Sequence, residues 1–310
     1  MKRKRKMTEP VPAIRPEPGR VQHLAPGLRV VLAPNPSPMT LHGTNTYLLG
    51  EGSVAVIDPG PDHAPHLDAI LAALAPGERI SHILVTHAHR DHSPLSRALS
   101  RAAGAPVLAY GGATAGRSRT MARLAATGAI EGGEGVDTEF MPDVMLADGE
   151  TVDGRTWSVK ALHTPGHFAN HLSFLWRDAI FCGDHVMGWN SSLVSPPDGD
   201  MGAYMASLDR LAAEGARRLY SGHGDPVEDP ALRIAELVRH RRGREAAILA
   251  ALAGGPADAA TLARAIYTDL PPGVLPAAER NVLAHLIDLE ERNLVRTEGD
   301  IALASRFASS

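Results

Sequence analysis

The chain has a single cysteine, Cys182, among its 310 residues. One cysteine cannot form an internal disulfide, so the sequence excludes small disulfide-stapled folds and favours a reducing, cytoplasmic location. Long apolar runs are also missing. None approaches the roughly 18 residues that a membrane span requires, so we expect no membrane association. Aromatic residues make up only 4% of the sequence, which leaves little material for stacking the bases of a single-stranded nucleic acid.

Neither sign of charge dominates, because 31 Lys and Arg oppose 35 Asp and Glu. This balance gives no overall attraction to nucleic acid or membrane, although local patches remain possible. Beyond the first six residues, the only lysine of the sequence is Lys160. Residues 1–20 combine a basic run, KRKRK at residues 2–6, with a Pro-rich stretch. This composition predicts a flexible extension without a core of its own.

Short β-type runs dominate the chain from Val21 to about Asp178. Each is rich in Val, Ile, Leu or aromatic residues and ends at Gly, Pro, Asp or Asn. The predicted strands are Arg29–Ala33, Thr46–Leu49, Val54–Ile57, Ile80–Thr86, Val107–Tyr110, Thr156–Leu162 and Leu172–Trp176, and the predicted helices between them are His66–Ala75 and Ser93–Ala103. This mixture predicts an α/β fold in which sheets are flanked by helices.

The pattern changes after Asp229, where amphipathic helices take over. The predicted helices are Leu232–Leu252, Ala257–Tyr267 and Ala277–Asn293, and Leu294–Ala304 predicts a hairpin that turns at Glu298-Gly299-Asp300. Three helices and a two-stranded wing are the order of a winged-helix module. We therefore predict one domain at residues 21–228 and a small winged-helix-like domain at residues 229–310.

The stretch THAHRDH, residues 86–92, holds three histidines and an aspartate. On a helix, His87 and His89 would point about 200° apart and could not share a metal ion. Directly after the predicted strand they can converge, because alternate residues of an extended chain face the same side. Asp91 and His92 would then lie where the next helix begins, so one turn could supply two neighbouring metal positions.

Further donors follow other β-type runs. His167 lies in HTPGH after TWSVKAL, Asp184 lies in CGDH after the short run Ala179–Cys182, and His223 lies in SGHG after RRLY. Unrelated loop histidines would not be expected to recur at four strand ends. A metal site needs three or four protein donors, and we predict that these strand ends supply them.

These motifs, in this order, resemble the metallo-β-lactamase superfamily from about Val21 to Glu228, and Asp58 in IDPG matches its usual first motif. The resemblance implies an αββα four-layer sandwich with the site along one edge of the two sheets. By motif it implies that His87, His89 and His167 hold one metal, that Asp91, His92 and His223 hold the other, and that Asp184 bridges them. Two zinc ions suit these ligands, and iron or manganese is also compatible.

Two metals of this kind imply hydrolysis by a hydroxide that bridges them, with Asp91 and Asp184 as the catalytic residues. Antibiotic hydrolysis is disfavoured, since true metallo-β-lactamases place Cys or Ser at the Asp184 position. The redox role of the flavodiiron proteins is also disfavoured, because those proteins carry glutamate at the His89 position. The 38 residues between Asp184 and His223 are too few for the insertion of the superfamily's RNA- and DNA-processing nucleases. A persulfide dioxygenase with one iron remains an alternative.

The stretches NPSPMTLHGTNTYLLG and GDHVMGWNSSLVSPPDGDMGAYMASLDRL, with the tail, resemble the β-lactamase-like-protein-2 group. That group includes a single-strand-specific endoribonuclease, so the resemblance implies cleavage of single-stranded RNA as the first hypothesis. A thioester hydrolase like glyoxalase II, or a lactone hydrolase, is the second. The basic glutathione-binding tail of glyoxalase II has no counterpart here. A homodimer is compatible with the sequence.

Some residues bear on the choice of substrate. The basic residues Arg239, His240, Arg241, Arg242 and Arg244 could hold phosphates, and Trp189 and Tyr204 are candidates for lining a substrate cleft. A DNA-binding regulator with a metal sensor is a third hypothesis. The would-be recognition helix Ala277–Asn293 carries Glu279, Asp288, Glu290 and Glu291 against Arg280 and Arg292, which disfavours DNA. A wall of the active site or a dimer contact suits this helix better.

Other polar residues near the motifs receive structural roles. His163 is expected to bond backbone or solvent, whereas His171 and His185 are expected to support the ligands or pack beneath them. Cys182 is expected to be a small core residue at a strand end.

Overall fold

The computed structural model describes residues 13–130, 132–133, 135–268 and 272–310. The basic run at residues 2–6, predicted to belong to a flexible extension, lies outside the described residues. Residues 13–20 are largely exposed but contact the rest of the chain at several points, one of which is the backbone hydrogen bond from Gly19 to Leu32. Ile14 is buried, and its backbone N–H donates to the carboxylate of Asp225 over 2.7 Å.

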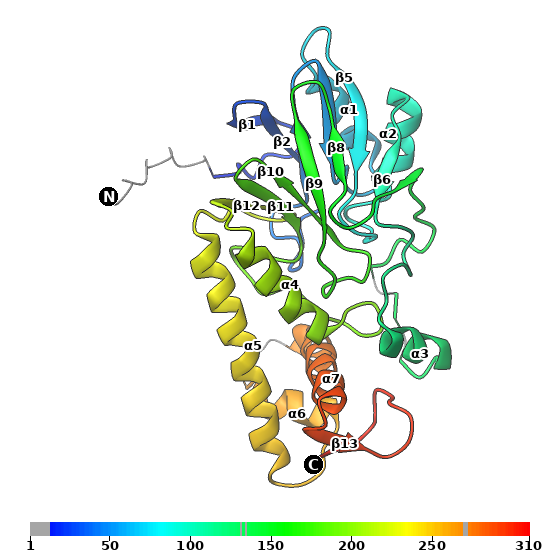
Figure 1. Ribbon diagram of the computed structural model, residues 1–310, viewed down its shortest axis with the longest axis vertical. Helices are drawn as coiled ribbons and strands as arrows, with labels where there is room; N and C mark the ends of the chain where they lie inside the picture. The colour runs from blue at the N-terminus through cyan, green and yellow to red at the C-terminus, as the bar shows by residue number, and fades with distance from the viewer. Residues whose placement is uncertain (1–12, 131, 134, 269–271) are drawn as a thin grey trace, which may run out of the picture.

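Two β-sheets pack face to face in the upper half of Figure 1. The first has the strand order β1-β2-β3-β4-β5-β6-β7 and the second the order β12-β11-β10-β9-β8. The first sheet comprises β1 (Val21–Ala25), β2 (Leu28–Leu32), β3 (Asn45–Leu49), β4 (Ser53–Ile57), β5 (Arg79–Leu84), β6 (Val107–Ala109) and β7 (Val144–Met145). The second comprises β8 (Thr151–Asp153), β9 (Ser158–His163), β10 (Leu172–Trp176), β11 (Ala179–Gly183) and β12 (Arg218–Ser221).

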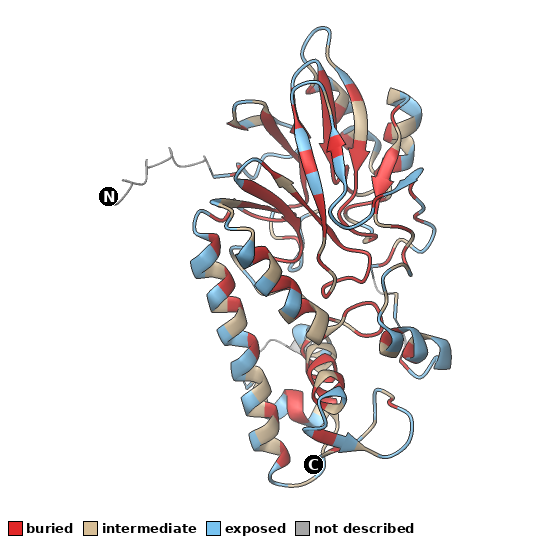
Figure 2. Cartoon of the chain, in the orientation of Figure 1, coloured by how far each residue is buried: buried red, intermediate tan, exposed pale blue. Residues whose placement is uncertain are grey.

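Alternation along the strands explains the layers, because successive side chains point to opposite faces of a sheet. Val30 packs between the sheets against residues such as Phe174, whereas its neighbour Val31 faces outward. The outer face of the first sheet is covered by α1 (Ala64–Ala72) and α2 (Leu95–Ala103), and that of the second by α4 (Met201–Ala213). The predicted αββα sandwich is confirmed, and Figure 2 shows both sheets largely buried.

Two helices were missed by the sequence predictions, α4 and α3 (Arg119–Thr127). Both carry an N-cap that the sequence contains, since the Asp200 side chain accepts a hydrogen bond from the backbone of Ala203, and Ser118 caps α3 in the same way. An N-cap satisfies a backbone donor that the first helical turn leaves unpaired. Tyr204, predicted to be a candidate for lining a cleft, therefore lies on a helix.

The C-terminal helices are α5 (Pro230–Leu252), α6 (Ala259–Ile266) and α7 (Leu275–Glu291), with a short 3₁₀ turn, η1 (Pro272–Val274), before α7. The wing pairs β13 (Val295–Thr297) with β14 (Phe307–Ser309). The predicted hairpin at Leu294–Ala304 is wrong in its return strand. Ile301 is buried in the helical core instead of pairing across a tight turn, so the chain returns only at Phe307. None of the helices described is both long and apolar enough to cross a membrane.

Candidate metal centre

All seven predicted donors lie where strands end at one edge of the sandwich. The loop after β5 carries four of them, and His167, Asp184 and His223 follow β9, β11 and β12. Neighbouring strands that end at one edge bring side chains far apart in sequence to one place. The structure therefore brings the whole predicted set together, and it does so in two groups.

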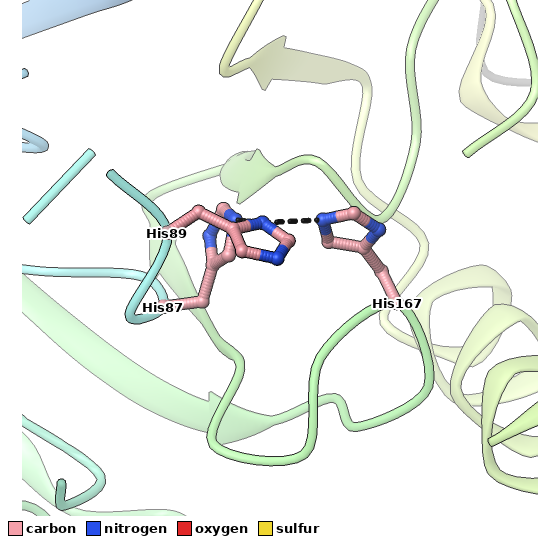
Figure 3. A group of neighbouring side chains, drawn as sticks. All are labelled: His87, His89 and His167. Carbon is pink, nitrogen blue, oxygen red and sulfur yellow. Dashed lines mark hydrogen bonds between the residues drawn. The ribbon is translucent and has the colours of Figure 1, made fainter. Parts of the chain in front are cut away.

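The first group consists of His87, His89 and His167 (Figure 3). The Nδ1 atom of His89 lies 2.8 Å from Nε2 of His87 and 3.1 Å from Nε2 of His167. Imidazoles from two separate loops thus direct ring nitrogens at one point. Three such nitrogens are a suitable ligand set for a transition metal.

The second group consists of Asp91, His92, Asp184 and His223. The Nε2 atom of His223 lies 3.1 Å from Oδ2 of Asp91 and 3.2 Å from Oδ2 of Asp184. Asp184 also approaches the first group, with Oδ2 at 3.8 Å from Nε2 of His167. Its carboxylate thus lies between the two groups, where a bridging ligand would be.

The donors fit a pair of metal ions. Ligand atoms within each group lie within 4.8 Å of one another, and Oδ1 of Asp184 is buried without a hydrogen-bond partner. A buried carboxylate oxygen left unpaired is costly, and a cation beside it would satisfy it. Imidazole and carboxylate together suit zinc, iron or manganese.

Asp58 holds the donors in place although it belongs to neither group. Its carboxylate accepts hydrogen bonds from the backbone and hydroxyl of Thr86 over 2.7 and 2.8 Å, and lies 3.0 Å from Nδ1 of His92. The Thr86 hydroxyl lies 2.9 Å from Nδ1 of His87. Bonds to the far nitrogen orient a ligating ring and set its tautomer. Asp58 has a φ of 51°, and such backbone strain is typical of functional sites.

Glycine is required beside the carboxylate that lies between the groups. A Cβ atom on Gly222 would lie 2.4 Å from Oδ1 of Asp184 and 2.7 Å from His92, far inside van der Waals contact. The glycine in SGHG therefore allows the backbone to approach the donors closely.

The pKa values differ between the two groups. Burial lowers the pKa of all three histidines of the first group, and that of His89 falls to about 3. For His223, burial alone would lower the pKa, but Asp184 and Asp91 outweigh it and raise the pKa to about 9. The first group is thus ready to bind a metal at neutral pH, whereas binding at the second displaces a proton.

A cavity of about 670 Å³ opens beside the donors and is lined by His89, Asp91, His167 and Asp184. Its apolar lining includes Met39, Met187, Leu193, Pro276 and Leu303, and its other charged residues are Asp198, Glu279 and Arg280. Pro276, Ala277, Glu279 and Arg280 belong to α7, so this helix forms a wall of the site, one of the two roles predicted for it. The contribution of Leu303 from the wing was missed, because it depends on how the C-terminal helices pack against the sandwich.

Three substrate-related predictions are corrected. Tyr204 is fully buried on α4, where its hydroxyl donates to the backbone of His185, and it does not line the cavity. Trp189 also lies outside the cavity lining. In the basic stretch, Arg241 is buried and Arg244 stacks on the ring of Tyr267. Arg241 therefore cannot contact a phosphate of a nucleic acid at the surface.

The structural roles predicted for the histidines near the motifs and for Cys182 are confirmed. The Nε2 atom of His163 lies 3.0 Å from the backbone oxygen of Ala169. His171 and His185 are buried, and the ring of His171 lies 5.2 Å from that of His87. Cys182 is a fully buried core residue.

Residues 39–223 match the sequence family described as the metallo-beta-lactamase superfamily. The chain belongs to this superfamily. Residues 259–305 match the beta-lactamase associated winged helix domain. With its two His/Asp groups, this metallo-beta-lactamase superfamily member is a metal-dependent hydrolase with a dinuclear-type site.

Relatives match most of the chain. A "Beta-lactamase-like protein 2 homolog" from Drosophila melanogaster is 31% identical over 86% of this chain and 88% of its own length. An "Atrochrysone carboxyl ACP thioesterase" from Aspergillus fumigatus is 32% identical over 94% of this chain and 87% of its own length.

Solved structures of the superfamily share the architecture. A metallo-beta-lactamase family protein from Thermus thermophilus has a TM-score of 0.73 at 27% identity, covering 93% of this chain and all (100%) of that one. A beta-lactamase domain protein from Burkholderia ambifaria has a TM-score of 0.79 at 22% identity, covering 96% and 95%. The likeness to the latter concerns the fold alone.

Proposed function

We propose that this hydrolase cleaves an acyl thioester. The observation that carries the proposal is the cavity beside the donors, whose walls expose Met39, Leu193 and Leu303. Such walls suit an apolar acyl group, because transferring it out of water is favourable by about 25 cal/mol per Å². The thioesterase from Aspergillus fumigatus, alignable over 94% of this chain, supports the same class of substrate.

In this proposal His87, His89 and His167 would hold one ion and Asp91, His92 and His223 the other, with Asp184 placed between the two groups. Two ions at these groups, proposed to be zinc, would supply Lewis-acid chemistry and would make water a stronger nucleophile near neutral pH. Asp91 faces the cavity and is ionised at neutral pH, since His92 and His223 hold its pKa below the usual range against the effect of burial. Its carboxylate can orient the attacking water and accept a hydrogen bond from it.

The competing hypothesis, cleavage of single-stranded RNA, stays a prediction. The burial of Arg241 removes one member of its proposed phosphate patch, although Arg239 and Arg242 are exposed. Apart from the donors, the charged lining of the cavity is Asp198, Glu279 and Arg280, which gives no excess of positive charge to attract a phosphodiester backbone. A lactone would fit the same apolar walls and is an outcome that the experiment separates.

The test uses purified protein with its metals quantified. It compares a medium-chain acyl thioester of N-acetylcysteamine, S-lactoylglutathione, an acyl lactone and a fluorescent single-stranded RNA, each with the Asp184→Ala variant as control. We expect thioester turnover that falls by more than about 100-fold in the variant, because the residue between the two metal groups is lost. RNA or lactone cleavage without thioester turnover would refute the proposal. One iron per chain with no hydrolysis would point to persulfide oxidation.

A further inference from the structure

The loop Ser192–Val194, here called the linking loop, contacts residues of the metal groups on one side. The backbone oxygen of Leu193 lies 2.6 Å from Nδ1 of His167, which donates to it when its other nitrogen faces the metal. The hydroxyl of Ser192 donates to the backbone oxygen of Asp184. This linking loop thus fixes the ring of one donor and the backbone of another.

Two side chains of the C-terminal helices bind the same loop from the other side. Oδ1 of Asn281, on α7, accepts hydrogen bonds from the backbone N–H of Val194 and from the guanidinium of Arg241, both at 3.1 Å. Arg241, on α5, also donates to the backbone oxygen of Ser192. Consecutive loop residues are therefore held between the helices and the metal donors.

Arg241 makes these contacts from a costly position. It is 2% exposed, and the partners that the structure gives it are neutral: the Asn281 amide, the Ser192 carbonyl and the ring of Tyr204, whose centroid lies 5.1 Å away. Burying a cation among neutral groups costs free energy that an apolar side chain of similar length would not. Stability of the fold alone does not account for an arginine here, whereas a requirement for fixed geometry does.

We propose that Arg241 and Asn281 are positioning residues of the metal centre. They hold the linking loop where it aims the His167 ring and places Asp184 between the two groups. The C-terminal helices are then part of the metal site, although they contribute no donor to either group among the described residues. This inference is independent of which bond the enzyme hydrolyses.

The test is a titration of metal-free protein with zinc against a chromophoric chelator. We expect Arg241→Met and Asn281→Leu each to weaken zinc binding, on the order of 10- to 100-fold, as loss of partners behind a metal ligand does. Asn281→Asp keeps both accepted hydrogen bonds and should bind zinc like the wild type. Absorption of the cobalt-substituted protein should change in the first two variants, because the ligand geometry at the metal changes.

Arg242→Met is the matched control, since Arg242 is exposed on the same helix one residue along. It removes the same charge and should leave zinc affinity unchanged. If Arg241→Met and Asn281→Leu lower the melting temperature of the metal-free protein but bind two zinc ions with wild-type affinity, the two residues serve stability alone and the proposal fails. Should Arg241→Met not fold, Asn281→Leu and Ser192→Ala decide the question by the same measurement.

Discussion

Asp58 shows how much of the metal centre depends on a residue that is not a donor. One carboxylate oxygen accepts from the backbone of Thr86, and the other accepts from the Thr86 hydroxyl and faces Nδ1 of His92. Because Nε2 of His92 faces the second group, its Nδ1 must carry the proton. A carboxylate is the side chain that can accept all three hydrogen bonds.

Asp58→Asn tests this role. The amide offers one accepting oxygen, so its NH₂ group would oppose either Nδ1–H of His92 or the backbone N–H of Thr86. We expect zinc affinity and kcat/KM to fall about 10- to 100-fold, measured by chelator competition and steady-state kinetics. Asp62→Asn, at an exposed position in the same loop, should change neither. Wild-type zinc affinity in Asp58→Asn would show that the His92 tautomer needs no carboxylate.

Single residues also show what the sequence could predict. The seven donors were predictable because they follow strands whose ends meet at one edge of the sandwich. Arg241 was assigned to a surface patch from its basic neighbours, yet the buried residues of α5 are Pro230, Ile234, Leu237, Arg241, Ile248 and Leu252. These intervals of three, four and seven are the helical repeat. The position of Arg241 in the helical repeat thus indicated that its side chain is buried, whereas its charge alone suggested that it is exposed.

At the scale of elements, α7 carries a buried histidine, His285, whose burial has a testable consequence. Both ring nitrogens of His285 are buried without a hydrogen-bond partner. Burial, with Arg241 adding to it, lowers the pKa of His285 from 6.5 to about 3. The unfolded chain therefore binds a proton that the folded chain refuses, and stability is lost as pH falls from 6.5 toward 3.

From pH 7 to pH 5 this group should cost about 2 kcal/mol of unfolding free energy. His285→Leu removes that contribution, so urea denaturation of the metal-free variant should show a correspondingly smaller loss between these pH values. Equal pH slopes for His285→Leu and wild type would mean that folding does not lower the pKa of His285.

The wing contributes Leu303 to the cavity, although Leu303 is 43% exposed. If acyl groups bind there, Leu303→Asp should raise KM for a medium-chain thioester by roughly 5- to 10-fold through lost apolar burial. The zinc content and kcat should stay close to wild type. Leu232→Asp, at an exposed leucine of α5 that does not line the cavity, is the control. An unchanged KM in Leu303→Asp would place the acyl group elsewhere.

Element positions were harder to predict than element types. The helix α4 has buried residues at Met201, Tyr204, Ser207, Leu208 and Leu211, a helical repeat that was present in the sequence but interrupted by polar and small residues. The wing was predicted too tight because Glu298-Gly299-Asp300 is a strong turn signal. Burial of Ile301 against the helices, a tertiary effect, lengthens the connection to β14.

At the scale of the whole molecule, α5 joins two hydrophobic cores. Ile234 and Leu237 pack with α4 and the second sheet, whereas Ile248 and Leu252 pack with α6, α7 and the wing. Figure 1 shows the helix running alongside both. Because α5 is one continuous helix, unfolding of the half that packs in one core destabilises the half that packs in the other. The sandwich and the C-terminal helices should therefore unfold together.

Zinc should stabilise both parts at once for the same reason. A ligand that binds only the folded state adds about 2.7 kcal/mol at a free concentration 100 times its Kd. We therefore expect calorimetry to show a single transition that moves to higher temperature as zinc is added. In Asp184→Ala, which weakens both groups, this shift should shrink. Two transitions, of which zinc moves only one, would show instead that the C-terminal helices fold independently of the metal centre, so that the contacts of α5 and the linking loop do not couple them.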